Sequence, residues 1–197
     1  MNKFLYIIFS LTLLCLSAFA DDIKEAGDAL DKNDYRTALM KYKNAASRGN
    51  AFAQLQVGNI FFTGGNGINK NYVEAVRWYK LAADQGYADG QHNLGTMFEE
   101  GNGVLQDYVE AVKYYRMAAS QGLAISQNSL GFMYWEGKGV TRDLLRAHMW
   151  MNLSASQGFD LSSGFREKIA RTLSQDQVEV AQRMARECKS TNYRNCK

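Results

Sequence analysis

Apolar and small residues recur along this chain with a period of about 36 positions. Four glycines follow one another at intervals of 37, 36 and 36 residues, and two sets of four alanines keep the same intervals. These residues are Gly49, Gly86, Gly122 and Gly158; Ala38, Ala75, Ala111 and Ala147; and Ala46, Ala83, Ala119 and Ala155. Repeats of this length stack into solenoids, whose usual product is an extended surface that binds another macromolecule.

Each repeat carries two stretches with a helical spacing of apolar residues, which predicts a pair of short antiparallel helices. In the second repeat the first helix has an apolar stripe from Ala75 to Ala82 and ends at Gly86, which supplies a left-handed C-cap. The second helix covers about 88–100, and the glycines that follow break it. The third repeat has the same order, with a second helix over about 124–136. The pattern therefore predicts an all-α chain of stacked helix pairs.

Hydrogen-bonding residues mark the start of each predicted first helix. Asp or Asn stands immediately before the apolar positions, where its side chain can accept a bond from an unpaired backbone N–H group. These residues are Asp34, Asn71, Asp107 and Asp143. Glu74 and Glu110 follow three positions later, so we expect capping boxes in the second and third repeats.

Glycine also recurs in the middle of the predicted second helices, at Gly58, Gly95 and Gly131. Glycine inside a helix costs about 1 kcal/mol relative to alanine. We therefore expect the backbones of neighbouring helices to approach too closely at these positions for a methyl group.

These signals divide the chain into a leader, two caps and four repeats. Residues 21–34 form half a repeat unit with one apolar face, and Ser174 with Gln177 opens a last amphipathic helix through a capping box. The predicted bounds are 1–20 for a cleavable signal peptide, 21–34 for an N-terminal capping helix, 35–71, 72–107, 108–143 and 144–173 for the repeats that fill 35–173, and 174–197 for a C-terminal capping helix.

The first 20 residues have the pattern of a secretory signal. Lys3 precedes an apolar run over 4–16, and residues 18–20 have the small-x-small form of a cleavage site. The alternative is an uncleaved anchor helix, but the run is shorter than the ~20 apolar residues that span a bilayer. We expect cleavage near Ala20, a periplasmic or secreted mature chain, and no transmembrane segment in it.

The net charge and the cysteine content limit which partners and which disulfides we expect. A formal net charge of +3 is far from the basic excess of proteins that bind phosphate backbones, so we expect no nucleic acid. Without the leader, the cysteines that remain are Cys188 and Cys196. An even pair in an oxidising compartment predicts a disulfide that closes the C-terminal tail.

Catalytic motifs are missing from the sequence. The two histidines, His92 and His148, lie in predicted helices without a neighbouring carboxylate or cysteine arrangement. We therefore expect no enzyme activity, no cofactor and no metal site. The repeated aromatic residues fit a carbohydrate or peptide platform, but their fixed phase across the repeats favours the core. They are Trp78, Tyr79, Tyr114, Tyr115, Tyr134, Trp135 and Trp150.

One surface feature suggests binding. Arg77 and Lys113 occupy equivalent positions in adjacent repeats, as do Lys80 and Arg116, so stacking would align these cations into a protein-binding ladder for an acidic peptide. The alternative is that Arg77 and Lys113 pair with the glutamates three residues before them on a solvated helix face.

The repeated strings resemble the Sel-one-like repeat family, a relative of the tetratricopeptide solenoids. The resemblance covers roughly residues 35–160. It is carried by Ala75 to Gly86, Asn93 to Phe98 and Gly101 to Val104 with Asp107, and again by Ala111 to Gly122 and Asn128 to Tyr134. It departs at Lys41, where the next repeat has Trp78, and in the turns, which lack the proline common in the family.

The resemblance implies a right-handed α-solenoid of antiparallel helix pairs that acts as an adaptor between proteins, often in bacterial envelopes. We expect an exported scaffold that binds another protein and catalyses nothing. One alternative is a beta-lactam-binding or weakly beta-lactam-hydrolysing enzyme like the cysteine-rich branch of the family, although the repeats here contain no cysteine. Another is a structural protein associated with the envelope or with peptidoglycan.

Overall fold

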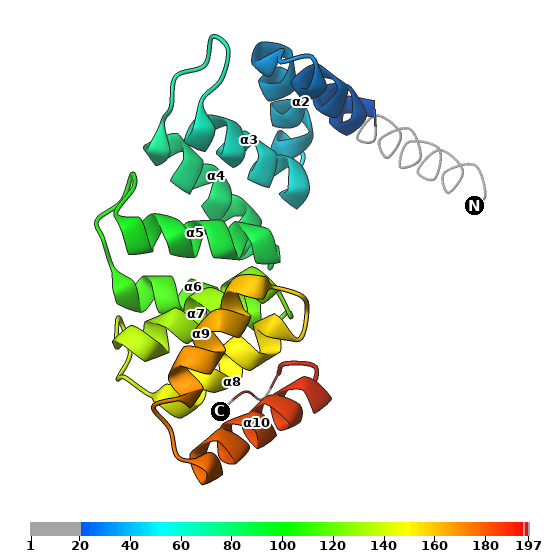
Figure 1. Ribbon diagram of the computed structural model, residues 1–197. Coiled ribbons are helices and arrows are strands. Elements are labelled where there is room, and N and C mark those ends of the chain that lie inside the picture. Colours follow the sequence, from blue (N-terminus) through cyan, green and yellow to red (C-terminus); the bar gives the residue numbers. More distant parts are fainter. Residues whose placement is uncertain (1–20, 195, 197) are drawn as a thin grey trace, which may run out of the picture. The chain divides into compact units, whose positions relative to one another are not determined.

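The computed structural model describes residues 21–194 and residue 196, and every regular element in that part of the chain is a helix (Figure 1). Residues 21–31 are helical. The helices that follow are α2 (Tyr35–Ser47), α3 (Ala51–Thr63), α4 (Tyr72–Asp84), α5 (Ala88–Glu100), α6 (Tyr108–Ala119), α7 (Ala124–Glu136), α8 (Leu144–Ala155), α9 (Asp160–Ala170) and α10 (Gln175–Ser190). The predicted all-α fold is confirmed, and the predicted signal peptide over 1–20 lies outside the described residues.

All four residues predicted as N-caps cap a helix. Asp34 Oδ1 accepts from the backbone N–H of Thr37 at 3.1 Å, and Asn71 Oδ1 accepts from Glu74 N at 3.1 Å. Asp107 caps α6 and Asp143 caps α8 in the same way. Each of these side chains satisfies a backbone donor that the helix itself leaves unpaired.

The capping boxes predicted at Glu74 and Glu110 are wrong. The backbone N–H of Asn71 already donates to Phe61 O at 2.7 Å, and that of Asp107 donates to Phe98 O at 2.9 Å. The N-cap residue therefore has no donor left for a returning glutamate, whose carboxylate forms an ion pair further along its helix instead. The box predicted at Ser174 and Gln177 is confirmed.

The chain divides into two compact units, one up to residue 82 and one from residue 83. In the first unit the helix over 21–31 packs on α2 and α3 through Ala26, which is fully buried, with Ile23 and Leu30 beside it. Lys41 on α2 contacts the carboxylates of Asp22 and Glu25, and these ion pairs link the helix over 21–31 to α2.

The second unit contains α5 to α10 in an order of neighbours that follows the sequence. α5 packs on α6, α6 on α7, α7 on α8 and α8 on α9, while α10 lies along α8 (Figure 1). Its core gathers apolar side chains from α6, α7, α8 and α9, with Trp150 and Met151 of α8 almost fully buried.

Glutamine side chains connect successive repeats inside this unit. Gln91 Nε2 donates to Ala83 O at 3.3 Å, and Gln91 Oε1 accepts from Gln121 Nε2 at 2.8 Å. One repeat later, Gln157 Nε2 donates to Gln127 Oε1 at 2.8 Å. Because buried amides are costly to leave unpaired, this network fixes the register of each repeat against the next.

The mid-helix glycines lie against side chains of the next helix. A Cβ at Gly58 would stand 2.6 Å from two ring atoms of Tyr79, and one at Gly95 would stand 2.9 Å from two ring atoms of Tyr115. At Gly131 the nearest atom would be Cγ of Met151, at 3.0 Å. A Cβ would overlap a tyrosine ring at Gly58 and at Gly95, as predicted, whereas at Gly131 it would press on the flexible Met151 side chain. The expected approach of a neighbouring backbone is found at Gly95, where Ala111 O would lie 3.3 Å from the Cβ, while at Gly58 and Gly131 the near atoms belong to side chains.

Most of the recurring aromatic residues belong to the core, as their phase favours. Tyr79, Tyr115 and Trp150 are at most 2% exposed, and Tyr114 and Tyr134 are also buried. Among the described helices, none is long and apolar enough to cross a membrane.

Candidate protein-binding pocket

A cavity of about 380 Å³ opens in the second unit between α6, α8 and the tail that follows α10. α6 and its C-cap contribute Lys113, Arg116, Met117 and Ser120; α8 contributes Trp150; and the tail contributes Tyr193, Arg194 and Cys196. This volume falls in the range of pockets that hold small ligands or side chains, about 300–1,000 Å³.

Three of the lining residues are cations, and each has a different environment. Arg116 Nη2 donates to the hydroxyl of Tyr134 at 3.0 Å, which orients its guanidinium. Lys113 Nζ lies 2.8 Å from a carboxylate oxygen of Glu110, and this hydrogen bond raises the pKa of Lys113. Within the described part of the chain, Arg116 and Arg194 have no carboxylate partner.

The apolar part of the lining is partly rigid and partly adaptable. Trp150 is 2% exposed and belongs to the core of the unit, so its position is fixed by packing. Met117, at the rim, is 39% exposed, and its unbranched side chain can adjust to a ligand. Tyr193 is half-buried against the same core.

The tail that forms one wall is held by covalent and packing constraints. Cys188 and Cys196 form the predicted disulfide, with Cα atoms 4.6 Å apart. Tyr193 N donates to Cys188 O at 3.0 Å, and the Tyr193 ring lies so close to Gly122 that a Cβ there would stand 3.0 Å from it. Asn192 and Tyr193 have φ angles of 52° and 63°. A left-handed conformation is costly for a tyrosine and persists only where the surroundings impose it.

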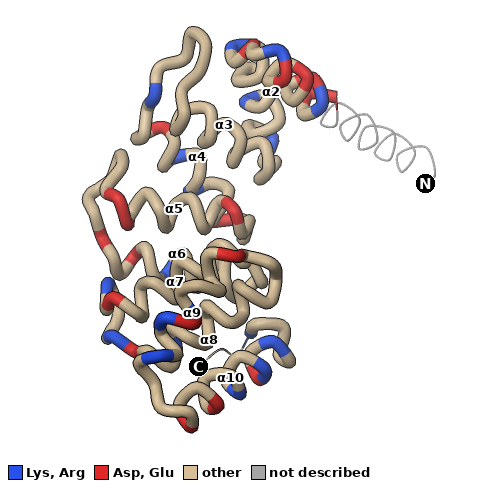
Figure 2. Tube along the Cα trace, in the orientation of Figure 1, with Lys and Arg blue, Asp and Glu red and all other residues tan. Residues whose placement is uncertain are grey.

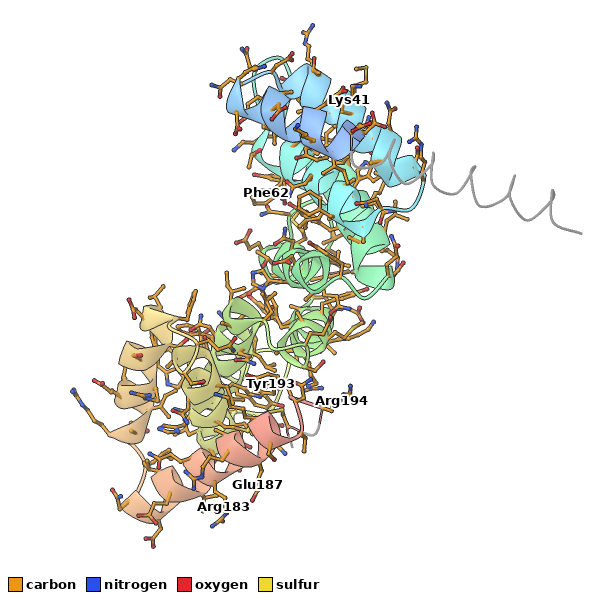
Figure 3. All side chains as sticks on the ribbon, turned by 90° about the vertical axis from the view of Figure 1, so that its right-hand side faces the viewer. Lys41, Phe62, Arg183, Glu187, Tyr193 and Arg194 are labelled. Carbon is orange, nitrogen blue, oxygen red and sulfur yellow. A yellow bond between two sulfur atoms is a disulfide. The ribbon has the colours of Figure 1, made fainter. Side chains whose placement is uncertain are left out.

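Figure 3 shows where this wall lies. Tyr193 and Arg194 stand at the C-terminal end of α10, while Arg183 and Glu187 lie further back along that helix. Figure 2 shows Lys and Arg at several places along α10. Among the described cations of α10 and the tail, Arg194 lines the pocket.

The four cations predicted to bind protein fall into two places. Lys113 and Arg116 lie together at the pocket. Arg77 and Lys80 are exposed on α4 in the first unit, and Arg77 pairs with Glu74 at 2.7 Å. The ion pairs offered as the alternative to a binding ladder are thus present in both helices. The ladder itself stays a prediction.

Of the described lining residues, Lys113 and Arg116 were identified from the sequence as candidates for binding, and others were missed, among them Trp150, Tyr193 and Arg194. Trp150 was assigned to the core, which is correct, but it also lines the cavity. Tyr193 and Arg194 lie between the paired cysteines, and this position is the feature of the sequence that could have identified them as lining residues. A loop closed by a disulfide at the end of the last helix either folds back onto the preceding repeats or projects into solvent. The sequence pattern does not distinguish between these two courses.

The histidines lie outside this pocket. His92 Nδ1 lies 3.0 Å from the hydroxyl of Ser126, and burial lowers the pKa of His92 to about 4. His148 is 2% exposed, its Nδ1 has no hydrogen-bond partner among the described residues, and burial, with a smaller effect of Arg166, lowers its pKa. Among the described residues, no group of three or more His, Cys, Asp or Glu side chains could hold a metal ion.

Comparison with known proteins identifies the repeat. The family model described as "Sel1 repeat" matches residues 51–87, 88–123 and 124–159, which together exceed half of the chain. The chain belongs to the Sel1 repeat family. This confirms the resemblance drawn from the repeated strings.

Curated relatives of this family match over one stretch. The chain is 36% identical over 84 residues to protein sel-1 homolog 2 of Rattus norvegicus, and 34% identical over 84 residues to the Homo sapiens protein of the same name. The matched stretch is 42% of this chain but 12% of each relative. The chain thus spans about an eighth of the length of these Sel1 relatives.

Solved Sel1 structures resemble more of the chain. A Sel1 repeat protein from Oxalobacter formigenes is 32% identical with a TM-score of 0.60, covering 66% of this chain and 97% of that one. A protective antigen present in uropathogenic Escherichia coli strains, described as displaying an SLR fold, is 25% identical with a TM-score of 0.62, covering 90% of this chain and 47% of that one. The predicted α-solenoid of antiparallel helix pairs is confirmed.

The Sel1 units and the predicted repeats differ in phase. The matched Sel1 units begin at residues 51, 88 and 124, each at the helix that follows one of the periodic glycines. The predicted repeats begin one helix earlier, at 35, 72 and 108. Both divisions cut the same stack of alternating helices.

Proposed function

We propose that this Sel1 repeat protein is an exported scaffold that binds another protein through the pocket between α6, α8 and the tail, and that it does so without catalysis. Sel1 repeats generally mediate protein interactions. Beyond this general role, we propose that the binding site is this pocket and that the protein acts after export.

The observation that carries the proposal is the composition of the pocket wall. Two guanidinium groups and an ammonium group line the pocket together with a buried tryptophan, and none of the described lining residues is acidic. Arginine, tryptophan and tyrosine are the residue types that dominate binding energy at protein interfaces. Among the described lining residues there is no nucleophile hydrogen-bonded to a base, which a hydrolytic site would need.

Export rests on the sequence of residues 1–20 and is supported by the disulfide. Structural disulfides form and persist in oxidising compartments and are rare in the cytosol. The Cys188–Cys196 pair closes the tail that forms part of the pocket. Intact-mass analysis of the protein from its native cells tests this part: a chain that begins at Asp21 with the disulfide formed is expected, and a chain that retains the first 20 residues contradicts cleavage.

Site-specific photocrosslinking in the cells of origin tests the binding. A photoreactive phenylalanine derivative at Met117, on the pocket rim, is expected to give a discrete protein adduct. The same group at Glu179, exposed on α10 away from the pocket, serves as the matched control and is expected to give none. Addition of Arg116→Glu should remove the Met117 adduct.

Two results would contradict the proposal. Equal adducts from Met117 and Glu179 would show that the pocket does not select a partner. Turnover of a chromogenic beta-lactam by the purified mature chain, abolished by a single substitution in the pocket, would show that the site is catalytic.

A further inference from the structure

The charge of the pocket points to an anionic ligand. Among its described lining residues, three are basic and none is acidic. Lys113 is already hydrogen-bonded to both carboxylate oxygens of Glu110, at 3.1 and 2.8 Å, so much of its charge is balanced. The charge that remains for a ligand belongs to Arg116 and Arg194.

The geometry of Arg116 suits a carboxylate. A guanidinium has five N–H donors in a rigid fork, and here one nitrogen is directed by the Tyr134 hydroxyl at 3.0 Å. The tyrosine oxygen is a neutral acceptor, so it orients the group without cancelling its charge. An oriented guanidinium can bind a carboxylate through two parallel hydrogen bonds, which a flexible lysine cannot match.

The size and the apolar lining require more than a small anion. A cavity of about 380 Å³ exceeds the volume of one carboxylate group with its first water molecules, and Met117, Trp150 and Tyr193 would gain nothing from an inorganic ion. The ligand therefore carries an apolar or aromatic group next to its negative charge. An acidic peptide segment has this composition, and an extended solenoid surface is suited to binding one.

From these observations we infer that the pocket binds a partner segment in which Asp or Glu neighbours a large apolar residue. The carboxylate pairs with Arg116 and Arg194, and the apolar side chain lies against Trp150 and Met117. This inference rests on the proposed protein-binding function and names the chemistry of the partner.

The tail makes this recognition depend on the disulfide. Tyr193, Arg194 and Cys196 form one wall, and the chain reaches that position through two left-handed residues between the bonded cysteines. Without the cross-link, nothing covalent holds Arg194 beside α6. The oxidised protein should therefore bind the segment more tightly than the reduced one.

An array of synthetic hexapeptides tests the inference directly. Each peptide places Glu or Asp next to Leu, Phe, Tyr or Trp, and stands beside a twin in which Gln or Asn replaces the acid. The mature oxidised protein is expected to retain acidic peptides at least tenfold better than their amide twins. Arg116→Gln and Arg194→Gln should each lower that preference at least fivefold, whereas Arg183→Gln, the same change on an exposed part of α10, should leave it unchanged.

Controls separate recognition from folding and from general attraction of anions. Thermal unfolding followed by circular dichroism should be the same for the three arginine variants within a few degrees, because all three side chains are exposed. Inorganic phosphate at the ionic strength of the buffer should not displace the acidic peptides. If phosphate displaces them, or if Arg183→Gln weakens binding as much as Arg194→Gln, the pocket is not the site and the inference is overturned.

The two proposals fail in different ways. A discrete crosslink at Met117 together with equal retention of acidic peptides and amide twins would preserve the protein-binding function and overturn the acidic ligand. Absence of a discrete crosslink from Met117 in the protein with an otherwise unaltered pocket would overturn the function itself.

Discussion

Alanine at each mid-helix glycine provides a graded test of how the repeats pack. The expected effect is the sum of two opposing contributions. Alanine gains about 1 kcal/mol over glycine in a helix. Inserting a methyl group into a packed interior costs about 1–3 kcal/mol, depending on whether the neighbour can move.

The neighbours differ in how firmly they are held. The new Cβ at Gly58 would meet the Tyr79 ring at 2.6 Å, and that ring is tied to Asn59 through its hydroxyl at 2.9 Å. At Gly95 the distance to the Tyr115 ring is 2.9 Å, and the Tyr115 hydroxyl is held by Glu99 at 2.5 Å.

Met151, the neighbour of Gly131, is unbranched and can change rotamer. We therefore expect Gly58→Ala to lose about 2 kcal/mol of unfolding free energy and Gly95→Ala about 1 kcal/mol, with Gly131→Ala within about 0.5 kcal/mol of the parent protein.

Urea unfolding followed by circular dichroism measures these differences, and two other helical glycines provide matched controls. A Cβ at Gly27 in the first unit, or at Gly164 in the second, would have no neighbouring atom of the described residues within 4 Å. Alanine at either position should raise stability by up to about 1 kcal/mol. If Gly58→Ala stabilised the protein as much as Gly27→Ala, the ring contact would not limit packing and the reasoning would be refuted.

Two further predictions concern titration and the tail. Burial lowers the pKa of His92 to about 4, so as pH falls from 6.5 toward 4 the unfolded chain takes up a proton that the folded chain excludes. Stability should therefore fall by about 2–3 kcal/mol between pH 7.5 and 4.5 through this group, and the parent protein should lose that much more than His92→Gln in urea titrations at the two pH values. Removing the disulfide by Cys188→Ser with Cys196→Ser should lower the unfolding free energy by about 2–3 kcal/mol, and an unchanged urea midpoint would contradict a structural role.

The helices were predictable because several local signals agreed with one another. Predicted second helices over 88–100 and 124–136 coincide with α5 and α7, since the apolar spacing and the glycines that flank each helix act over short distances. The capping boxes failed for a reason that is not local: the N-cap N–H of Asn71 is used by Phe61 of the preceding helix.

The pocket was only half predictable for a similar reason. Lys113 and Arg116 lie on the surface of one helix, and repeat phase is enough to place them there. Arg194 reaches the same cavity through a tail whose course depends on a disulfide and on two left-handed residues. The glutamine network was also readable in principle, because Gln54, Gln91 and Gln127 recur with the period of the repeat. Their burial and partners follow only from tertiary packing.

The most direct test of the central claim is the indole N–H resonance of Trp150 in a two-dimensional ¹⁵N spectrum of the mature, oxidised protein, assigned with Trp150→Phe. Adding the pool of acidic hexapeptides should shift this resonance in a saturable way, while that of Trp135, which packs with Phe165 and Lys168, should stay in place. A stationary Trp150 signal, or an equal shift with the amide twins, would contradict a pocket that recognises an acidic partner segment.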